Sequence, residues 1–369
     1  MDEAGAVLVS TAFSAIVREG KDFACVLLAP DGRTVVQSTG VPVFLGTTTN
    51  TARRLLERLP PEAWAPGSVV GTNDVWLGTG HLYDLTLVMP VFVDGAVVAL
   101  SAVVVHLPDV GGRGWGREAR QVFEEGFQIP PMRLGNAVAF EPLLFDLLRA
   151  NVRRPDEVTG DMEAAVNSLS VMSAQLVGLC RELTPRIFER ACIELESRTE
   201  SVMRSRIAEL STGRHRASVA TDEVGGISVR IELAVEVAGD ELVVDLAGSS
   251  PQVPAAVNCS FPYARAYVIF ALKCLLAPDL PMNEGVVRPI HILAPEGTVV
   301  NSRFPAAGGA RNIVGMYLPP LVFRALADVL PAQVVADSAA PPPILTITGV
   351  DRRSGELFAG YLEVPGGFG

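Results

Sequence analysis

Lysine is nearly absent from this chain of 369 residues, which contains only Lys21 and Lys273. The formal net charge is −11, and no basic stretch is interleaved with aromatic residues. A protein that binds nucleic acid through its phosphates needs a basic surface of that kind. Nucleic acid is therefore not an expected partner.

Long apolar runs are also missing. A membrane-spanning helix needs about 20 predominantly apolar residues. The apolar run 96–105 has the length of a strand and is broken by Ser101. Asp2 and Glu3 are acidic where a secretory signal would be basic. No membrane association is expected, and a cytoplasmic location is predicted.

Several common catalytic motifs are absent too. The chain has no GxSxG, no HExxH and no GxGxxG after a predicted strand, and Gly20-Lys21-Asp22 lacks the other residues of a phosphate loop. A nucleotide site of the phosphate-loop type is therefore excluded. The cysteines form no CxxC pair, and their odd number suits a reducing compartment. They are Cys25, Cys180, Cys192, Cys259 and Cys274.

Histidine is scarce, but two of the four histidines begin the same motif, His-Leu-x-Asp. It occurs as His81-Leu-Tyr-Asp84 and as His106-Leu-Pro-Asp109. The segment between them predicts a β-hairpin, with strands over 85–93 and 96–105 and a turn at Asp94-Gly95. Antiparallel pairing then places position 84 opposite 105 and position 83 opposite 106, within one residue. His81, Asp84 and His106 are expected to meet at the open end of this hairpin.

Two imidazoles and one carboxylate suit a divalent transition metal with open coordination positions. His81, Asp84 and His106 are therefore candidate metal ligands, and Asp109 is a candidate fourth ligand or an acceptor that orients one imidazole. On spacing alone, hydrogen-bonded structural histidines remain the alternative. His215 and His291 are expected to be structural or exposed to solvent.

The long segment 112–134 has no clear periodicity, which is typical of a functional loop. It contains Glu124 and Glu125, which follow the second histidine closely enough to lie near it. Glu125 is a candidate acid or base, and a solvated charge pair beside a turn is the alternative for either glutamate.

The pattern of helices and strands predicts an α+β fold, because elements of each kind occur in blocks rather than as repeated βαβ units. Three segments are expected: a β-rich lobe over 1–135, a helical segment over 136–213 and an α+β lobe over 214–369. Helices are predicted over 6–17, 49–59, 143–149, 161–210 with a break at Thr184-Pro185, 263–276 and 315–329. Further strands are predicted over 23–28, 34–37, 227–237, 242–247, 289–293 and 343–348.

Seven motifs in the same order resemble those of the hydantoinase B/oxoprolinase family. This family includes B-type components of ATP-dependent N-methylhydantoinases, the C-terminal part of oxoprolinase and the alpha subunit of acetone carboxylase. The motifs lie at 73–84 (NDVWLGTGHLYD), 106–112 (HLPDVGG), 124–134 (EEGFQIPPMRL), 151–161, 244–250, 281–285 and 304–307. The chain departs from the family pattern at Leu107, Val75-Trp76 and Thr79-Gly80, and it is expected to be shorter than family members at both ends.

The resemblance implies that His81, Asp84 and His106 bind a divalent metal, manganese first, with zinc or iron as alternatives. It also implies an A-type partner subunit that binds ATP and phosphorylates a substrate oxygen, so that the two subunits form a hetero-oligomer. The function it implies is that of a catalytic B-type subunit that opens a hydantoin, 5-oxoproline or lactam ring. Asp109 and Glu125, which the sequence places near the histidines, are the catalytic candidates for this reaction. A subunit of an ATP-dependent ketone carboxylase and a non-catalytic scaffold subunit are the alternatives.

Overall fold

The structure is a computed structural model that describes residues 1–38, 40–44, 46–60, 64–223, 226–336, 344–355 and 357–363. It contains both helices and strands in blocks, which confirms the predicted α+β class. The N-terminal half comprises α1 (Asp2–Thr11), α2 (Ala15–Arg18), β1 (Phe23–Leu28), β2 (Thr34–Gln37), η1 (Pro42–Phe44), α3 (Thr47–Arg58), β3 (Ser68–Thr72), β4 (Asp84–Val93), β5 (Ala96–His106), η3 (Val122–Glu124), β6 (Met132–Asn136) and α4 (Pro142–Asn151).

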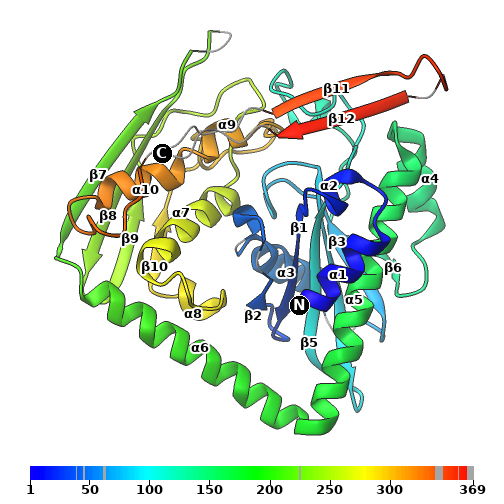
Figure 1. Cartoon of the computed structure of the whole chain (residues 1–369), viewed down its shortest axis with the longest axis horizontal. Helices are drawn as coiled ribbons and strands as arrows, with labels where there is room; N and C mark the ends of the chain where they lie inside the picture. Colours follow the sequence, from blue (N-terminus) through cyan, green and yellow to red (C-terminus); the bar gives the residue numbers. More distant parts are fainter. Residues whose placement is uncertain are drawn as a thin grey trace.

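A six-stranded antiparallel sheet organises this half, in the order β2-β1-β5-β4-β3-β6. Its two faces enter different cores, because neighbouring residues of a strand point to opposite sides. Leu100, Ala102 and Val104 of β5 belong to a core shared with the C-terminal half. Val103 and Val105 face the other way, toward α1 and α5. Figure 1 shows α1 and α5 together on that side of the sheet.

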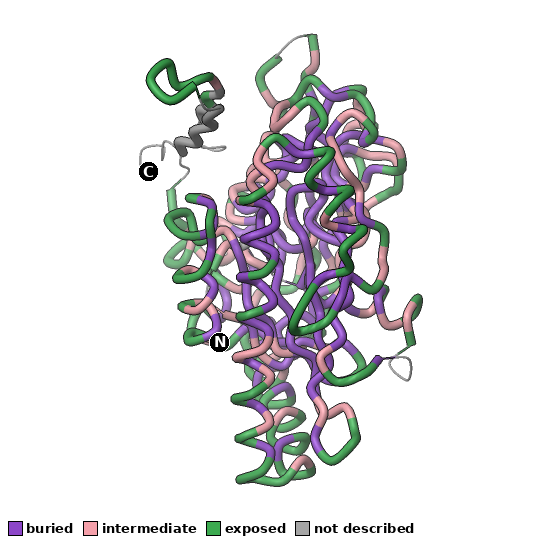
Figure 2. The backbone as a smooth tube through the Cα atoms, turned by 90° about the vertical axis from the view of Figure 1, so that its right-hand side faces the viewer, coloured by how far each residue is buried: buried purple, intermediate pink, exposed green. Residues whose placement is uncertain are grey.

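Two long helices, α5 (Pro155–Leu183) and α6 (Pro185–Ala208), link the halves of the chain. The predicted break at Thr184-Pro185 is confirmed: Thr184 has a φ of 69° and Pro185 begins α6. Proline suits the first helical turn, where its missing N–H costs no hydrogen bond. α6 runs from this elbow to the second sheet, and the elbow itself is largely exposed (Figures 1 and 2).

The C-terminal half contains β7 (Gly213–Ala220), β8 (Arg230–Ala238), β9 (Glu241–Asp245), α7 (Phe261–Leu276), α8 (Glu284–Val287), β10 (Ile290–Leu293), α9 (Asn312–Gly315), α10 (Leu318–Leu326), β11 (Ile344–Val350) and β12 (Leu357–Glu363). The second sheet has the order β10-β9-β8-β7, and only its β9–β10 pair is parallel. β11 and β12 form a separate antiparallel pair.

One hydrophobic core spans both halves, since it joins residues of β1 and β5 to residues of β8, β9, α7 and α10. α7 is buried within this core, with Ala264, Val268 and Leu272 fully covered. The site described below lies where these two halves meet. The division into three segments stays a prediction.

The single helix predicted over 6–17 is wrong, because the chain forms α1 and α2 with a break between them. A buried carboxylate stabilises the break: Asp161 Oδ1 accepts from Phe13 N at 2.7 Å and from Ser14 N at 3.1 Å. The Ser14 side chain in turn caps α2. The strand β6 was not predicted, because its pairing with β3 joins segments far apart in the sequence.

Among the helices in the described part of the chain, none combines the length and the apolar character that crossing a membrane requires.

Removing part of the Leu100 side chain should destabilise the fold strongly. Leu100 is fully buried between β1 and β4, so Leu100→Ala leaves a cavity that costs about 2–5 kcal/mol. Urea denaturation measures this loss. Val138 is 94% exposed, and Val138→Ala should change stability by less than about 0.5 kcal/mol. Equal effects of the two substitutions would contradict the burial described for β5.

Candidate metal centre

The open end of the β4–β5 hairpin brings together the three predicted metal ligands. Asp84 begins β4, His106 ends β5, and the two residues are directly paired across the ladder. His81 lies in the turn just before β4, and its Nε2 is 2.7 Å from Asp84 Oδ2. The hairpin prediction is therefore confirmed, including the convergence of these three side chains.

The register differs by one residue from a regular hairpin. Near the turn Phe92 pairs with Val97, but Val91 pairs with Ala99, so Val98 is an extra residue on β5. A β-bulge of this kind adds one residue to one strand and shifts all later pairs. It pairs position 84 with 106 instead of 105, which is within the one-residue tolerance of the prediction.

The ligand atoms of His81, Asp84 and His106 lie within 4.8 Å of one another, and all three side chains are buried. Buried polar atoms in proteins normally have hydrogen-bond partners. Among the described residues, however, no partner is present for His81 Nδ1, Asp84 Oδ1 or either ring nitrogen of His106. A divalent cation would satisfy these atoms, and their chemistry suits a transition metal. The residues present therefore fit a metal.

Asp84 and His81 are prepared for this role by their surroundings. Burial opposes ionisation of Asp84, but the neighbouring His81 and Arg311 overcome it and hold its pKa well below the usual range. Burial, with Arg311 nearby, lowers the pKa of His81 to about 3. At neutral pH the site thus holds a carboxylate and a neutral imidazole, the protonation states that metal ligands need.

Arg311 is a site residue that the sequence analysis missed. Its Nη2 donates to Asp84 Oδ2 at 3.0 Å, its Nε donates to the carbonyl of Thr79, and its guanidinium lies 4.4 Å from the centre of the Tyr263 ring. Thr79 Oγ1 also donates to Asp84 Oδ2. Nothing in its local sequence separates Arg311 from the many other arginines of the chain.

Aromatic side chains form one wall of the centre. The His106 ring stacks on Tyr83 at 5.4 Å and lies 5.0 Å from Trp115, measured between ring centres. The partly exposed Trp115 also lies 6.2 Å from the His81 ring. The aromatic rings thus pack against both imidazoles on this side of the centre.

Glu125, predicted as an acid or base, is buried next to the centre. Its Oε1 accepts from Gly308 N at 2.8 Å and Gly309 N at 2.5 Å, while its Oε2 has no partner among the described residues. Gly308 packs directly on Gly80, since a Cβ added to Gly308 would lie 2.3 Å from the Gly80 carbonyl. One segment of backbone therefore separates Glu125 from the turn that carries His81.

Asp109 lies outside this group of side chains. Its Oδ1 accepts from Gly111 N at 2.9 Å and from Arg153 Nη1 at 2.8 Å, and its Oδ2 accepts from the backbone N–H of Arg153. Both carboxylate oxygens therefore connect the loop after β5 to the link between α4 and α5. Glu124 is partly exposed and pairs with Arg113 at 2.7 Å.

Asn73, the first residue of the first family motif, holds the surrounding loops in place. Its Nδ2 donates to the carbonyls of Leu82 at 2.7 Å and Phe127 at 3.0 Å, and its Oδ1 accepts from Ile129 N at 2.6 Å. One buried amide thus joins the His81 turn to the segment that follows Glu125. The motif alone does not indicate this role.

The protonation of Glu125 predicts a pH-dependent difference in stability. Burial raises its pKa to about 7 from an ordinary value of 4.5. A raised pKa stabilises the folded state fully below about pH 4.5, and this contribution is lost as the pH rises through about 7. Glu125→Gln stays neutral, so the wild type should lose thermal stability relative to this variant across that interval, measured with a chelator present.

The control for this measurement is Glu118→Gln, which changes an exposed glutamate of the same loop. Its melting temperature should follow that of the wild type at every pH. Parallel curves for the wild type and Glu125→Gln would contradict the burial of a titrating carboxyl group at position 125.

All residues of the chain, 1–369, match the family model described as Hydantoinase B/oxoprolinase. The chain therefore belongs to this family, as its motifs indicated.

Three relatives illustrate the match. The chain is 27% identical over 382 residues to the B component of a putative D-/L-hydantoinase from Pseudomonas sp. strain NS671, covering 98% of this chain and 64% of the relative. It is 26% identical over 380 residues to the 5-oxoprolinase PfmaA of Pestalotiopsis fici, and the match covers 98% of this chain and 29% of that protein. The crystal structure of the ATP-dependent caprolactamase from Pseudomonas jessenii superposes with a TM-score of 0.90 at 25% identity. The superposition covers 99% of this chain and 63% of the caprolactamase chain. The chain thus spans less than two thirds of each of these proteins.

Proposed function

We propose that this chain is the B-type subunit of an ATP-dependent hydrolase of cyclic amides and opens a hydantoin, 5-oxoproline or lactam ring. The observation that carries the proposal is the buried set of His81, Asp84 and His106 beside the Glu125 carboxyl group, in which four ligand atoms have no hydrogen-bond partner among the described residues. The relatives support the substrate class, since their names specify a hydantoinase, a 5-oxoprolinase and a caprolactamase.

The partner in this proposal is an A-type subunit that binds ATP. An unstrained ring amide resists attack because its carbonyl is stabilised by resonance, and phosphorylation of the carbonyl oxygen removes that protection. The chain has no phosphate-loop motif of its own. The hydantoinase relative is named as one subunit of its enzyme, which supports a hetero-oligomer of two subunit types.

His81, Asp84 and His106 would hold the divalent metal, manganese in the first instance, with zinc or iron as alternatives. When bound, such a metal supplies Lewis-acid activation of water and of the substrate carbonyl. Arg311 keeps Asp84 ionised and oriented, and Trp115 and Tyr83 keep the His106 ring in place. The protein thus fixes both the charge and the geometry of the ligand set.

Glu125 is the proposed acid for the nitrogen that leaves when the ring opens. Its pKa of about 7 lets it hold a proton near neutral pH and release it in the reaction. Its Oε2 is the oxygen that can carry this proton, because only Oε1 is engaged by backbone N–H groups among the described residues. Asp109 acts instead by positioning the loop after β5, since both its oxygens are bonded to other groups.

Loss of the histidines should remove the metal. Elemental analysis of the purified wild-type chain should find close to one manganese, zinc or iron per chain, and His81→Ala with His106→Ala should abolish it. His291→Ala is the matched control, because His291 lies on β10 and contacts Glu241. A wild-type chain that takes up no divalent metal, even with its A-type partner, would contradict the proposal.

Turnover should depend on both the partner and the site. With the A-type subunit and ATP, His81→Ala should lower the rate of ring opening by more than about 100-fold. Loss of a residue that only hydrogen-bonds to a metal ligand usually lowers activity by about 10- to 100-fold. Hydantoin, 5-oxoproline and caprolactam are the substrates to assay. ATP hydrolysis that requires bicarbonate would favour the ketone carboxylase alternative, and unchanged turnover in His81→Ala would exclude a catalytic role for the centre.

A further inference from the structure

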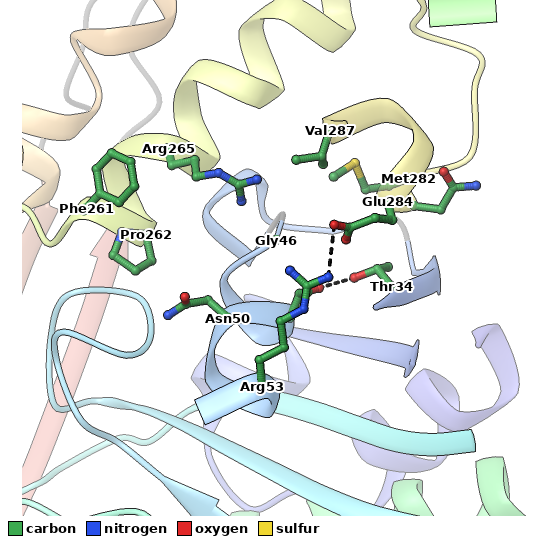
Figure 3. Close-up of a pocket in the computed structure, with 12 residues that line it drawn as sticks. Thr34, Gly46, Asn50, Arg53, Phe261, Pro262, Arg265, Met282, Glu284 and Val287 are labelled. Carbon is green, nitrogen blue, oxygen red and sulfur yellow. Dashed lines mark hydrogen bonds and ion pairs between the residues drawn. The ribbon is translucent and has the colours of Figure 1, made fainter. Parts of the chain in front are cut away.

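A pocket with several polar and charged side chains in its lining lies apart from the candidate metal centre, between α3, the start of α7 and α8 (Figure 3). It has a volume of about 150 Å³, and none of the metal-centre side chains lines it. Pockets that take drug-sized ligands usually measure about 300–1,000 Å³. The size therefore suits a single small group rather than a whole nucleotide.

Arg265 of α7 is the central feature of this pocket. Its guanidinium extends across the pocket toward Gly46, where a Cβ added to the glycine would lie 3.3 Å from Nη1 (Figure 3). Within the described residues, no side chain or carbonyl forms a hydrogen bond or ion pair with it. Arg265 is partly exposed, and burial of the rest of the side chain lowers its pKa, so its charge is only partly solvated. Such a cation is normally paired.

A second arginine approaches from α3. Arg53 Nη2 donates to Glu284 Oε1 at 3.1 Å, and Glu284 is the first residue of α8. The pocket thus contains two guanidinium groups and one carboxylate, so its lining has a net positive charge. The two arginines also repel each other, and an anion between them would relieve this repulsion.

The backbone at the pocket favours an anion as well. Gly46, which lines the pocket, is the N-cap of α3 and offers no side chain to the N–H groups of the first helical turn. Helix N-termini carry a partial positive charge and bind anions through such groups. This contribution adds to that of the two arginines, which define the site.

We propose that this pocket binds a phosphate-sized oxyanion, held by Arg265 from one helix and by Arg53 from another. Guanidinium groups that approach from different directions match a tetrahedral anion, whose oxygens point to several sides. Neighbouring α3 residues support the His81 turn, because Asn50 Nδ2 and Thr51 Oγ1 donate to the Leu77 carbonyl at 2.6 and 2.9 Å. An anion in the pocket therefore stabilises the helix on which this turn rests.

Calorimetric titration of the full-length chain with inorganic phosphate, at constant ionic strength, tests the proposal. The wild type should bind phosphate saturably, and Arg265→Gln should weaken binding about 10- to 100-fold, the effect of losing hydrogen bonds to a charged group. Glu284→Gln should strengthen binding several-fold, because it removes the negative charge from the lining. If these residues had only a structural role, Glu284→Gln would not increase the affinity for phosphate.

Arg190→Gln is the matched control, since Arg190 is an exposed arginine of α6. It should leave phosphate binding unchanged. Arg265→Lys keeps the charge and should retain more affinity than Arg265→Gln, while circular dichroism verifies that each variant is folded. Absence of saturable binding to the wild type, equal binding by Arg265→Gln, or tighter binding of acetate than of phosphate would each overturn the assignment.

Discussion

The buried ion pair between Arg311 and Asp84 joins the two halves of the chain at the candidate metal centre. Both side chains are almost fully excluded from solvent. An isolated charge in such a place is very costly, and breaking a buried pair by removing one partner typically costs about 3–5 kcal/mol. The carboxylate of the candidate ligand Asp84 thus depends on an arginine more than two hundred residues later, and the three candidate ligands can adopt this arrangement only when the two halves are packed together.

Other contacts at this junction also join the N-terminal half of the chain to the segment that carries Arg311. The backbone of Gly308 and Gly309 binds Glu125, and the Asn258 amide binds the carbonyl of Ala307 at 2.9 Å. One short segment, 307–311, therefore contacts both Glu125, the candidate acid, and Asp84, the candidate metal ligand. Burial raises the pKa of both carboxyl groups, but at Asp84 the neighbouring His81 and Arg311 overcome this effect and the group is ionised. Glu125, without a cation in contact among the described residues, has its pKa raised to about 7. Environment rather than residue type sets these roles.

Local signals predicted much of this arrangement. The Asp94-Gly95 turn and the β-rich runs beside it predicted the hairpin, and the two histidine motifs at its open end predicted that His81, Asp84 and His106 lie together. Thr184-Pro185 marked the helix elbow correctly. The interactions that escaped prediction join distant segments: Asp161 that interrupts the first helix, β3 that pairs with β6, and Arg311 that approaches Asp84. A sequence pattern carries periodicity and turn chemistry, but not the identity of a partner far along the chain.

The bulge at Val98 determines which side of the sheet each later residue of β5 faces. Neighbouring residues of a strand face opposite sides of the sheet, so one extra residue exchanges the two faces for everything beyond it. Without Val98 in the bulge, a regular ladder would place Val105 opposite Asp84 and would turn His106 toward α5. The run 102–105 is apolar throughout and would fit either face, so burial alone does not choose between them. His106 is roughly 25 Å from Val98, at about 3.3 Å per residue of strand. A single unpaired residue near the turn thus decides whether His106 and Asp84 lie on the same face of the sheet.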